Sequence, residues 1–252
     1  MNDIEFLGLE LEDFACFAGK HKINLQTTEK ENIIVIMGSN GSGKTSLYNG
    51  FWWVLHGHKL AEKNTHQDGS KQKVEYYRHE NDIKDTYSVT LKIKFEGKTY
   101  DIRRTYTHSM REITLSIIES GEEIKDKKEL FTEIKETLEK VDIETYELPP
   151  RPKYRGKGEQ VLQWLTKYIT KRKQAGKAPI FLDDRTPTMD KKPTKEIAKK
   201  LGTIPNQTIL LTSPQELPKL TPSKEFKKSI NKKYNLETKQ VENRRWHTKI
   251  TT

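Results

Sequence analysis

Eight residues near the start of the chain have the types and spacing needed to hold a triphosphate. They read Gly38-Ser39-Asn40-Gly41-Ser42-Gly43-Lys44-Thr45 and match the pattern G-x-x-x-x-G-K-[ST]. Several backbone N–H groups must converge on a phosphate, and a glycine-rich turn lets the main chain curve that closely. The segment therefore predicts a binding site for a nucleoside triphosphate.

The end of this loop supplies two side chains with separate roles. We expect Lys44 to reach the β- and γ-phosphates and Thr45 to place its hydroxyl on Mg²⁺. A helix that begins here adds the positive end of its dipole. The predicted nucleotide-binding residues of this segment are Gly38, Ser39, Asn40, Gly41, Ser42, Gly43, Lys44, Thr45 and Ser46, and Lys44 is also a predicted catalytic residue.

A second group of candidate residues lies far along the chain, where the apolar run Ile180-Phe181-Leu182 ends in Asp183 and Asp184. In this arrangement the first carboxylate holds Mg²⁺ and the second polarises the attacking water. A hydrophobic run that ends in two acids is common by itself. It gains weight here because Asp190 follows seven residues after Asp183, and because another apolar strand, 208–212, comes next.

The phosphate loop requires a strand before it and a helix after it, and both are predicted. Residues 33–37 form an apolar run, and residues 45–56 place Leu47, Phe51, Val54 and Leu55 on one helical face, with Gly57 as the terminator. Trp52 and Trp53 lie beside that face, so we expect them in the core rather than in a ligand platform. Residues 4–11 and 22–25 are predicted as short strands that lead to the central strand 33–37.

The middle of the chain predicts an antiparallel meander followed by a helix. Tyr87 to Phe95 alternate strictly between apolar and polar residues, 100–102 continue on a returning strand, and 113–117 alternate again. Asp126 begins a capping-box pattern, and apolar residues at helical spacing extend to Val141. Arg103 and Arg104 on the returning strand either contact nucleotide or couple the two lobes, but strand arginines are more often solvated or paired.

The chain is long enough for one α/β domain built of two lobes. Three prolines within Leu148-Pro149-Pro150-Arg151-Pro152 exclude regular structure and mark a boundary. The predicted organisation is an N-terminal lobe at 1–148, a proline-rich connection at 149–155, a C-terminal lobe at 156–220, and a mobile basic polar tail at 221–252.

Charge is distributed unevenly along the chain. Residues 1–150 hold 21 Lys and Arg against 27 Asp and Glu, a net charge of −6, whereas residues 151–252 hold 25 against 9, a net charge of +16. A basic half of this size favours a polyanionic partner, most commonly DNA, although a merely soluble lysine-rich surface is the alternative. The single Cys16 and the lack of an 18-residue apolar run predict a cytoplasmic protein with no membrane span.

Taken together, these motifs resemble the ATPase heads of the SMC-like family of ABC-type ATPases. The resemblance covers roughly residues 1–220 and is closest to the ATPases of DNA sulfur modification (phosphorothioation) and of double-strand-break repair. Its matching segments are 11–21, the phosphate loop, 54–57, 100–104, Lys157-Gly158-Glu159-Gln160 as the ABC signature, Leu182-Asp183-Asp184 as the Walker B strand and Met189-Asp190 as the D-loop.

The resemblance implies a fold, a cofactor and partners. The fold is an α/β P-loop NTPase of the ABC/SMC-head type, with two lobes, a mixed central sheet and an antiparallel meander. ATP and Mg²⁺ are the implied cofactors, and two heads sandwich the nucleotide as a homodimer, with Gly156, Lys157, Gly158, Glu159 and Asp190 completing the site. DNA and a nuclease or DNA-modifying protein are the implied partners.

Departures from the family pattern leave two functions open. The long coiled coil that family members insert between the lobes is absent from this sequence. Gly156, Asp184 and Ser213 stand where the family usually has serine, glutamate and histidine, which predicts slow hydrolysis. One interpretation is an ATP-hydrolysing head that acts on DNA in repair, modification or defence. The other is a nucleotide-gated binding or scaffold module with little or no turnover.

Overall fold

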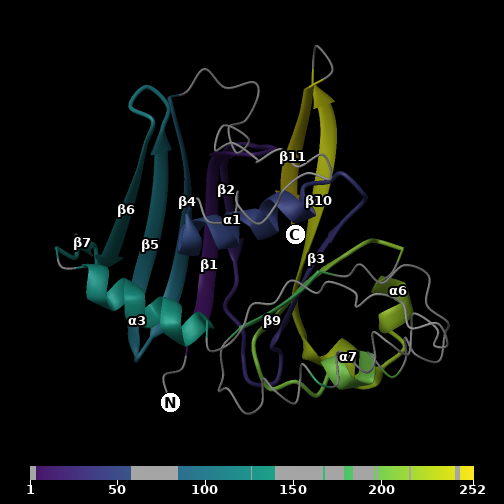
Figure 1. Ribbon diagram of the computed structural model, residues 1–252. Helices are drawn as coiled ribbons and strands as arrows, with labels where there is room; N and C mark the ends of the chain where they lie inside the picture. The colour runs from purple at the N-terminus through teal and green to yellow at the C-terminus, as the bar shows by residue number, and fades with distance from the viewer. Residues whose placement is uncertain are drawn as a thin grey trace, which may run out of the picture.

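The structure is a computed structural model that contains two β-sheets flanked by helices (Figure 1). It describes residues 4–57, 85–125, 127–139, 167, 179–183, 196, 198–215, 217–241 and 245–252. The segments that carry Asp126, the predicted connection at 149–155, the signature at 156–160, Asp184 and Asp190 lie outside the described residues, so the predictions made for them stay predictions.

The first sheet is antiparallel and has six strands in the order β2-β1-β4-β5-β6-β7. Its strands are β1 (Ile4–Phe14), β2 (Phe17–Asn24), β4 (Thr86–Phe95), β5 (Lys98–Thr107), β6 (Glu112–Glu119) and β7 (Glu122–Glu123). Buried residues alternate with exposed ones over the second half of β4, as expected for a strand with one face in the core. The predicted meander is confirmed by the pairing of β4 with β5 and of β5 with β6.

The first two strands differ from the prediction. Residues 4–11 and 22–25 were expected to be short strands leading into the central strand, but β1 and β2 are longer and pair antiparallel with each other. β1 also pairs with β4, so both strands belong to the six-stranded sheet. The two strands were therefore predicted with shorter bounds than the structure shows, and the sequence pattern did not specify their partners.

The second sheet has five strands in the order β11-β10-β3-β9-β8. Its members are β3 (Ile33–Gly38), β8 (Ile180–Asp183), β9 (Thr208–Thr212), β10 (Ile230–Val241) and β11 (Arg245–Thr251). Neighbouring strands are parallel except β10 and β11, which form an antiparallel hairpin, so this central sheet is mixed as predicted.

The central strand β3 is buried on both faces, which accounts for its continuous apolar run. Ile34 and Ile36 belong to the core shared with the six-stranded sheet. Ile33 and Val35 belong to a second core on the opposite face of the five-stranded sheet. A parallel strand covered on both sides reads as an unbroken hydrophobic segment rather than an alternating one.

The prediction of a mobile tail over 221–252 is wrong. This segment forms α7 (Lys224–Ser229), β10 and β11, after the short helix α6 (Leu217–Leu220). β10 pairs in parallel with β3, the strand that precedes the phosphate loop, and Tyr234 and Leu236 on β10 are buried. The predicted N-terminal lobe therefore shares its central strand with a sheet built mostly from later parts of the chain.

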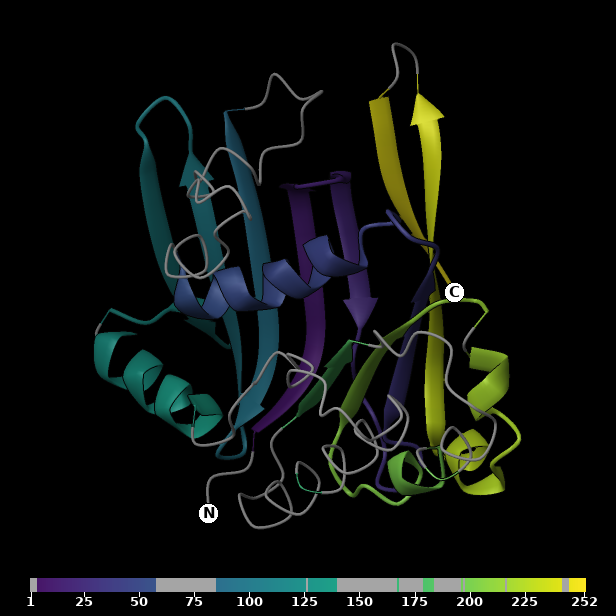
Figure 2. The same cartoon turned by 45° about the vertical axis from the view of Figure 1, so that its right-hand side comes forward.

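Helix α1 (Lys44–His56) crosses one face of the six-stranded sheet (Figure 2). Its predicted face of Leu47, Phe51, Val54 and Leu55 is buried, and Trp53 is buried beside it. α1 ends at Gly57, whose N–H still donates to the Trp53 carbonyl and whose positive φ of 65° turns the following chain out of the helix. A second helix, α3 (Lys127–Glu139), lies within the predicted helix and near the lower ends of β5 and β6 in Figure 1. Its Ile134 is buried in the core that includes residues of the six-stranded sheet.

One buried side chain bridges the two sheets. The amide of Gln207, which immediately precedes β9, accepts from the Phe6 N–H at 2.8 Å and donates to the Phe6 carbonyl at 2.6 Å. It also donates to the Leu25 carbonyl at 2.6 Å. Tyr234 on β10 makes a further bridge, because its hydroxyl donates to the Asn24 carbonyl. These contacts fix the five-stranded sheet against the first two strands of the other sheet.

Candidate functional site

The phosphate loop lies between the carboxyl end of β3 and the start of α1, as predicted. Gly41 and Gly43 have φ of 78° and 94°, values that residues with a β-carbon rarely adopt. The Gly43 carbonyl accepts the first helical hydrogen bond, from the Leu47 N–H at 2.8 Å. The loop therefore turns directly into the N-terminus of α1, where backbone N–H groups and the helix dipole favour an anion.

Lys44 folds back over the loop. Its Nζ donates to the Gly38 carbonyl at 2.6 Å and to the Ser39 carbonyl at 3.0 Å. The ammonium group of Lys44 is thus held against the first two residues of the loop. The side chain of Thr45 is exposed on the first turn of α1 and that of Ser46 is partly buried.

The loop is packed too closely for side chains at two glycines. A β-carbon at Gly38 would lie 2.0 Å from the Ser42 hydroxyl oxygen. A β-carbon at Gly43 would lie 2.6 Å from the Cys16 sulfur and 3.2 Å from the Thr248 hydroxyl oxygen. The motif predicted the loop glycines, but Cys16 and Thr248 carry no motif, so sequence analysis missed these two contacts.

The acidic strand reaches the same edge of the sheet as the phosphate loop. In the parallel register, Ile36 of β3 is opposite Leu211 of β9, and Leu211 is opposite Asp183 of β8. Two strand spacings separate Ile36 from Asp183, about 10 Å between backbones. Because the carboxyl ends of parallel strands meet at one edge, β8 ends beside the phosphate loop, where ligands bind in open α/β sheets.

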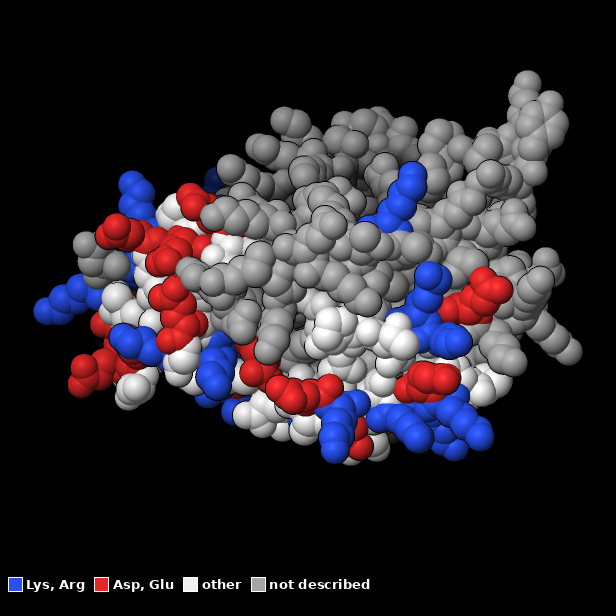
Figure 3. All heavy atoms as spheres, turned by 90° about the horizontal axis from the view of Figure 1, so that it is seen from below, with Lys and Arg blue, Asp and Glu red and all other residues white. Residues whose placement is uncertain are grey.

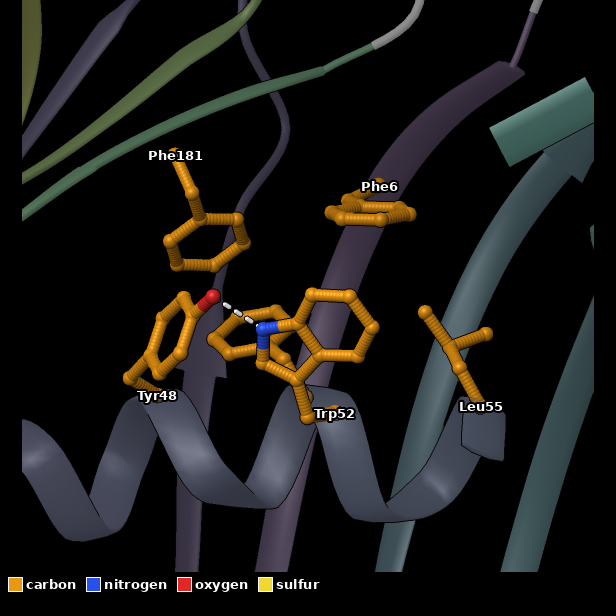
Figure 4. Close-up of a pocket in the computed structure, with 6 residues that line it drawn as sticks. Phe6, Tyr48, Trp52, Leu55 and Phe181 are labelled. Carbon is orange, nitrogen blue, oxygen red and sulfur yellow. Dashed lines mark hydrogen bonds between the residues drawn. The ribbon is translucent and has the colours of Figure 1, made fainter. Parts of the chain in front are cut away.

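An aromatic cluster ties α1 to β8. Phe181 on β8 packs edge-on against Phe51 of α1, with ring centroids 4.4 Å apart, and against Tyr48 at 5.7 Å. Figure 4 shows these rings with Phe6, Trp52 and Leu55 around a small apolar pocket, in which Trp52 donates to the Tyr48 hydroxyl. The cluster keeps the helix that follows the phosphate loop in contact with the strand that ends in Asp183.

The two strand arginines have structural partners. Arg103 forms an ion pair with Glu12 at 3.1 Å. Arg104 donates to the Val54 carbonyl at 3.2 Å near the end of α1, and burial lowers the pKa of its guanidinium to about 10. That value leaves Arg104 protonated at neutral pH. Both arginines are thus paired within the protein, which is the more common situation for strand arginines.

Positive and negative side chains are mixed on the described surface that Figure 3 shows. α7 carries three exposed lysines, Lys224, Lys227 and Lys228, beside the exposed Glu225, and α3 carries exposed glutamates at 129, 133 and 136 beside the exposed Lys128. Within the described residues no group of three His, Cys, Asp or Glu is placed to hold a metal ion. No helix in the described part of the chain is long and apolar enough to cross a membrane.

Solved structures show the same fold. The SMC head domain from Thermotoga maritima matches with a TM-score of 0.61 and 13% identity over 98% of this chain and 99% of that chain. An SmcHead bound to the C-winged helix domain of ScpA matches with a TM-score of 0.59 and 12% identity over 98% of both chains. An Smc head domain with an extended coiled coil, bound to the C-terminal domain of ScpA derived from Pyrococcus furiosus, matches with a TM-score of 0.59 and 11% identity over 100% of this chain and 97% of that chain.

The architecture and the phosphate loop together define a P-loop ATPase fold of the SMC-head type, as predicted. The chain belongs to the AAA domain family, whose model matches residues 9–248. A search of curated proteins finds no match.

Proposed function

We propose that this protein is an SMC-like head that binds and hydrolyses ATP with Mg²⁺. The observation that carries the proposal is the shared edge of the central sheet, where the glycine loop with Lys44 and the strand ending in Asp183 come within two strand positions of each other. A triphosphate held by the loop would extend over this edge. The fold and the family membership support the same class of activity.

The residues of the loop fit a phosphate group. Gly41 and Gly43 have positive φ, a loop conformation in which main-chain N–H groups can converge on an anion. The Ser42 hydroxyl is buried and has no hydrogen-bond partner among the described residues. Lys44 would exchange its bonds to the loop carbonyls for bonds to phosphate oxygens, which are stronger because both partners are charged.

Thr45 and Asp183 would hold Mg²⁺, which neutralises phosphate charge when bound. Asp184 is the proposed residue that orients and polarises the attacking water. An aspartate is one methylene shorter than the glutamate usual at this position, so we propose that turnover is slow. This substitution also favours a second candidate function, a nucleotide-gated scaffold that closes on ATP with little hydrolysis.

We further propose that two copies sandwich ATP, each offering Gly156, Lys157, Gly158 and Glu159 to the phosphate loop of the other, with Asp190 nearby. A helix N-terminus supplied by a second copy stabilises γ-phosphate charge only when nucleotide bridges the two copies.

The net charge of +16 over 151–252 and the lysines of α7 support DNA as a partner. The sequence resemblance supports a role in DNA repair, modification or defence, together with a nuclease or DNA-modifying protein. The single cysteine supports a reducing compartment, and we propose the cytoplasm.

Two measurements test the proposal. ATP binding and phosphate release are measured with and without DNA for the wild-type chain and for Lys44→Ala, in which both should be lost. Size in solution is measured with Mg²⁺ and a non-hydrolysable ATP analogue, where we expect a shift from one subunit to two. DNA-stimulated turnover supports the motor function, and ATP-dependent dimerisation without turnover supports the scaffold. A wild-type chain that binds no ATP would refute both.

A further inference from the structure

Thr248 on β11 joins three parts of the chain behind the phosphate loop. Its side chain is 2% exposed. Its backbone N–H donates to the Cys16 carbonyl at 2.9 Å, between β1 and β2. Its hydroxyl donates to the Ser42 carbonyl at 3.2 Å, within the phosphate loop. One residue therefore connects the last strand, the β1–β2 turn and the loop.

The hydrogen bond to Ser42 fixes the direction of one peptide group. In a planar trans peptide the C=O and the next N–H point in opposite directions. Because the Ser42 carbonyl points toward Thr248, the N–H of Gly43 points away from β11. That N–H belongs to the last glycine of the motif, whose backbone must face the phosphates if the loop is to cradle them.

The contact leaves little freedom for the peptide to rotate. A β-carbon at Gly43 would meet the Thr248 hydroxyl oxygen at 3.2 Å and the Cys16 sulfur at 2.6 Å, so β11 and the β1–β2 turn press against the loop at this point. Thr248 is itself anchored by its backbone to Cys16. The hydroxyl is therefore presented from a fixed strand and not from a flexible surface side chain.

We propose that Thr248 is a positioning residue for nucleotide binding, whose hydroxyl holds the Ser42–Gly43 peptide with the Gly43 N–H directed at the phosphates. The proposal rests on the proposed function, because it requires that the loop binds ATP. Thr248 acts through the loop and does not touch the nucleotide. It also gives the C-terminal hairpin, which the sequence suggested was a tail, a role at the site.

The test compares three substitutions. Thr248→Val keeps the shape and removes the hydroxyl, whereas Thr248→Ser keeps the hydroxyl. Thr238→Val is the matched control, because Thr238 lies directly opposite Thr248 in the hairpin and its buried hydroxyl has no partner among the described residues. We expect Thr248→Val to weaken ATP and ADP binding by roughly three- to tenfold, the loss equivalent to about one hydrogen bond. Thr248→Ser and Thr238→Val should stay within about twofold of wild type.

A spectroscopic readout separates positioning from general weakening. The sequence contains two Ser-Gly pairs, at 42–43 and 120–121, so labelling serine carbonyls with ¹³C and glycine nitrogens with ¹⁵N selects the amides of Gly43 and Gly121. Gly121 lies in the turn between β6 and β7 and serves as an internal reference. ADP should shift the Gly43 signal in the wild type and in Thr248→Ser, and shift it less in Thr248→Val even at saturating ADP.

Three results would overturn the positioning role of Thr248. If the wild type binds ATP and Thr248→Val binds it equally well, the positioning role is overturned and the proposed function stands. Equal losses in Thr248→Val and Thr238→Val, together with equal falls in thermal midpoint, would also overturn it, because they indicate loosening of the hairpin as a whole. If the wild type binds no nucleotide, the proposed function fails and this inference fails with it.

Discussion

Replacing Gln207 with leucine should separate the stability of the sheet junction from the chemistry of the site. Gln207 is 6% exposed and its amide makes three hydrogen bonds with the backbones of Phe6 and Leu25. Leucine has a similar size but leaves these buried groups without their partner, and each such group costs about 1–3 kcal/mol. Since the added apolar contacts offset part of this loss, we expect the free energy of unfolding to fall by about 3 kcal/mol.

Urea unfolding followed by circular dichroism measures this change. With a slope of about 3 kcal/mol per molar urea, the midpoint should fall by about 1 M. Gln26→Leu is the control, because Gln26 is exposed and its side chain makes no hydrogen bond with a described residue, so its midpoint should not move. A Gln207→Leu midpoint within about 0.3 M of the wild type would refute the idea that this bridge stabilises the junction.

Three other experiments probe the loop, an ion-pair cluster and a helix cap. Gly43→Ala should abolish measurable ATP binding and lower the thermal midpoint, because φ is 94° and the new β-carbon would lie 2.6 Å from the Cys16 sulfur. Adding Cys16→Ala to this variant removes the clash with sulfur but leaves the backbone strain, so only part of the lost thermal stability should return. For Glu10, partial burial raises its pKa, but hydrogen bonds from two lysines of β2 outweigh this and lower it below the usual 4.5. The folded pKa is thus below the unfolded one, so the contribution of Glu10 is present above pH 4.5 and is lost on acidification. Glu10→Gln should therefore lower the thermal midpoint slightly at pH 7, and the difference from wild type should shrink as the pH falls below 4.5. Ser223→Ala removes the hydroxyl that caps α7 by accepting from a backbone N–H at 3.3 Å, and should cost about 1 kcal/mol in urea unfolding.

Local patterns were sufficient for the parts of the fold whose structure depends on neighbours in sequence. Most of these elements were predicted close to their observed bounds: the phosphate loop, α1 and its end at Gly57, and strands β4, β6, β8 and β9. The strand β5 was predicted only over 100–102 and extends from Lys98 to Thr107. A glycine with positive φ, an apolar helical face and a strict alternation each leave a signal within about ten residues. The prediction that α1 buries one face and Trp53 was confirmed for the same reason.

The C-terminal segment shows where local patterns are insufficient. β10 contains several lysines, and this composition led to the prediction of a basic tail. Tyr234 and Leu236, two residues apart, are buried and mark the strand, but their signal is short. The pairing of Tyr234 with Ile36 joins positions almost two hundred residues apart, and no periodicity within either segment specifies that choice.

The same distinction applies to the site. The phosphate loop could be predicted from the sequence because its motif consists of eight adjacent residues. The groups that pack against the loop and the helix after it come from elsewhere: Cys16 of the β1–β2 turn and Thr248 of β11 contact the loop, and Phe181 of β8 contacts α1. Each is an ordinary side chain whose effect depends on where the two sheets meet. The motif therefore predicts the position of the phosphate loop, whereas the packing around the loop depends on strands that no motif identifies. We expect substitutions at Thr248 to reveal that dependence more directly than substitutions within the motif.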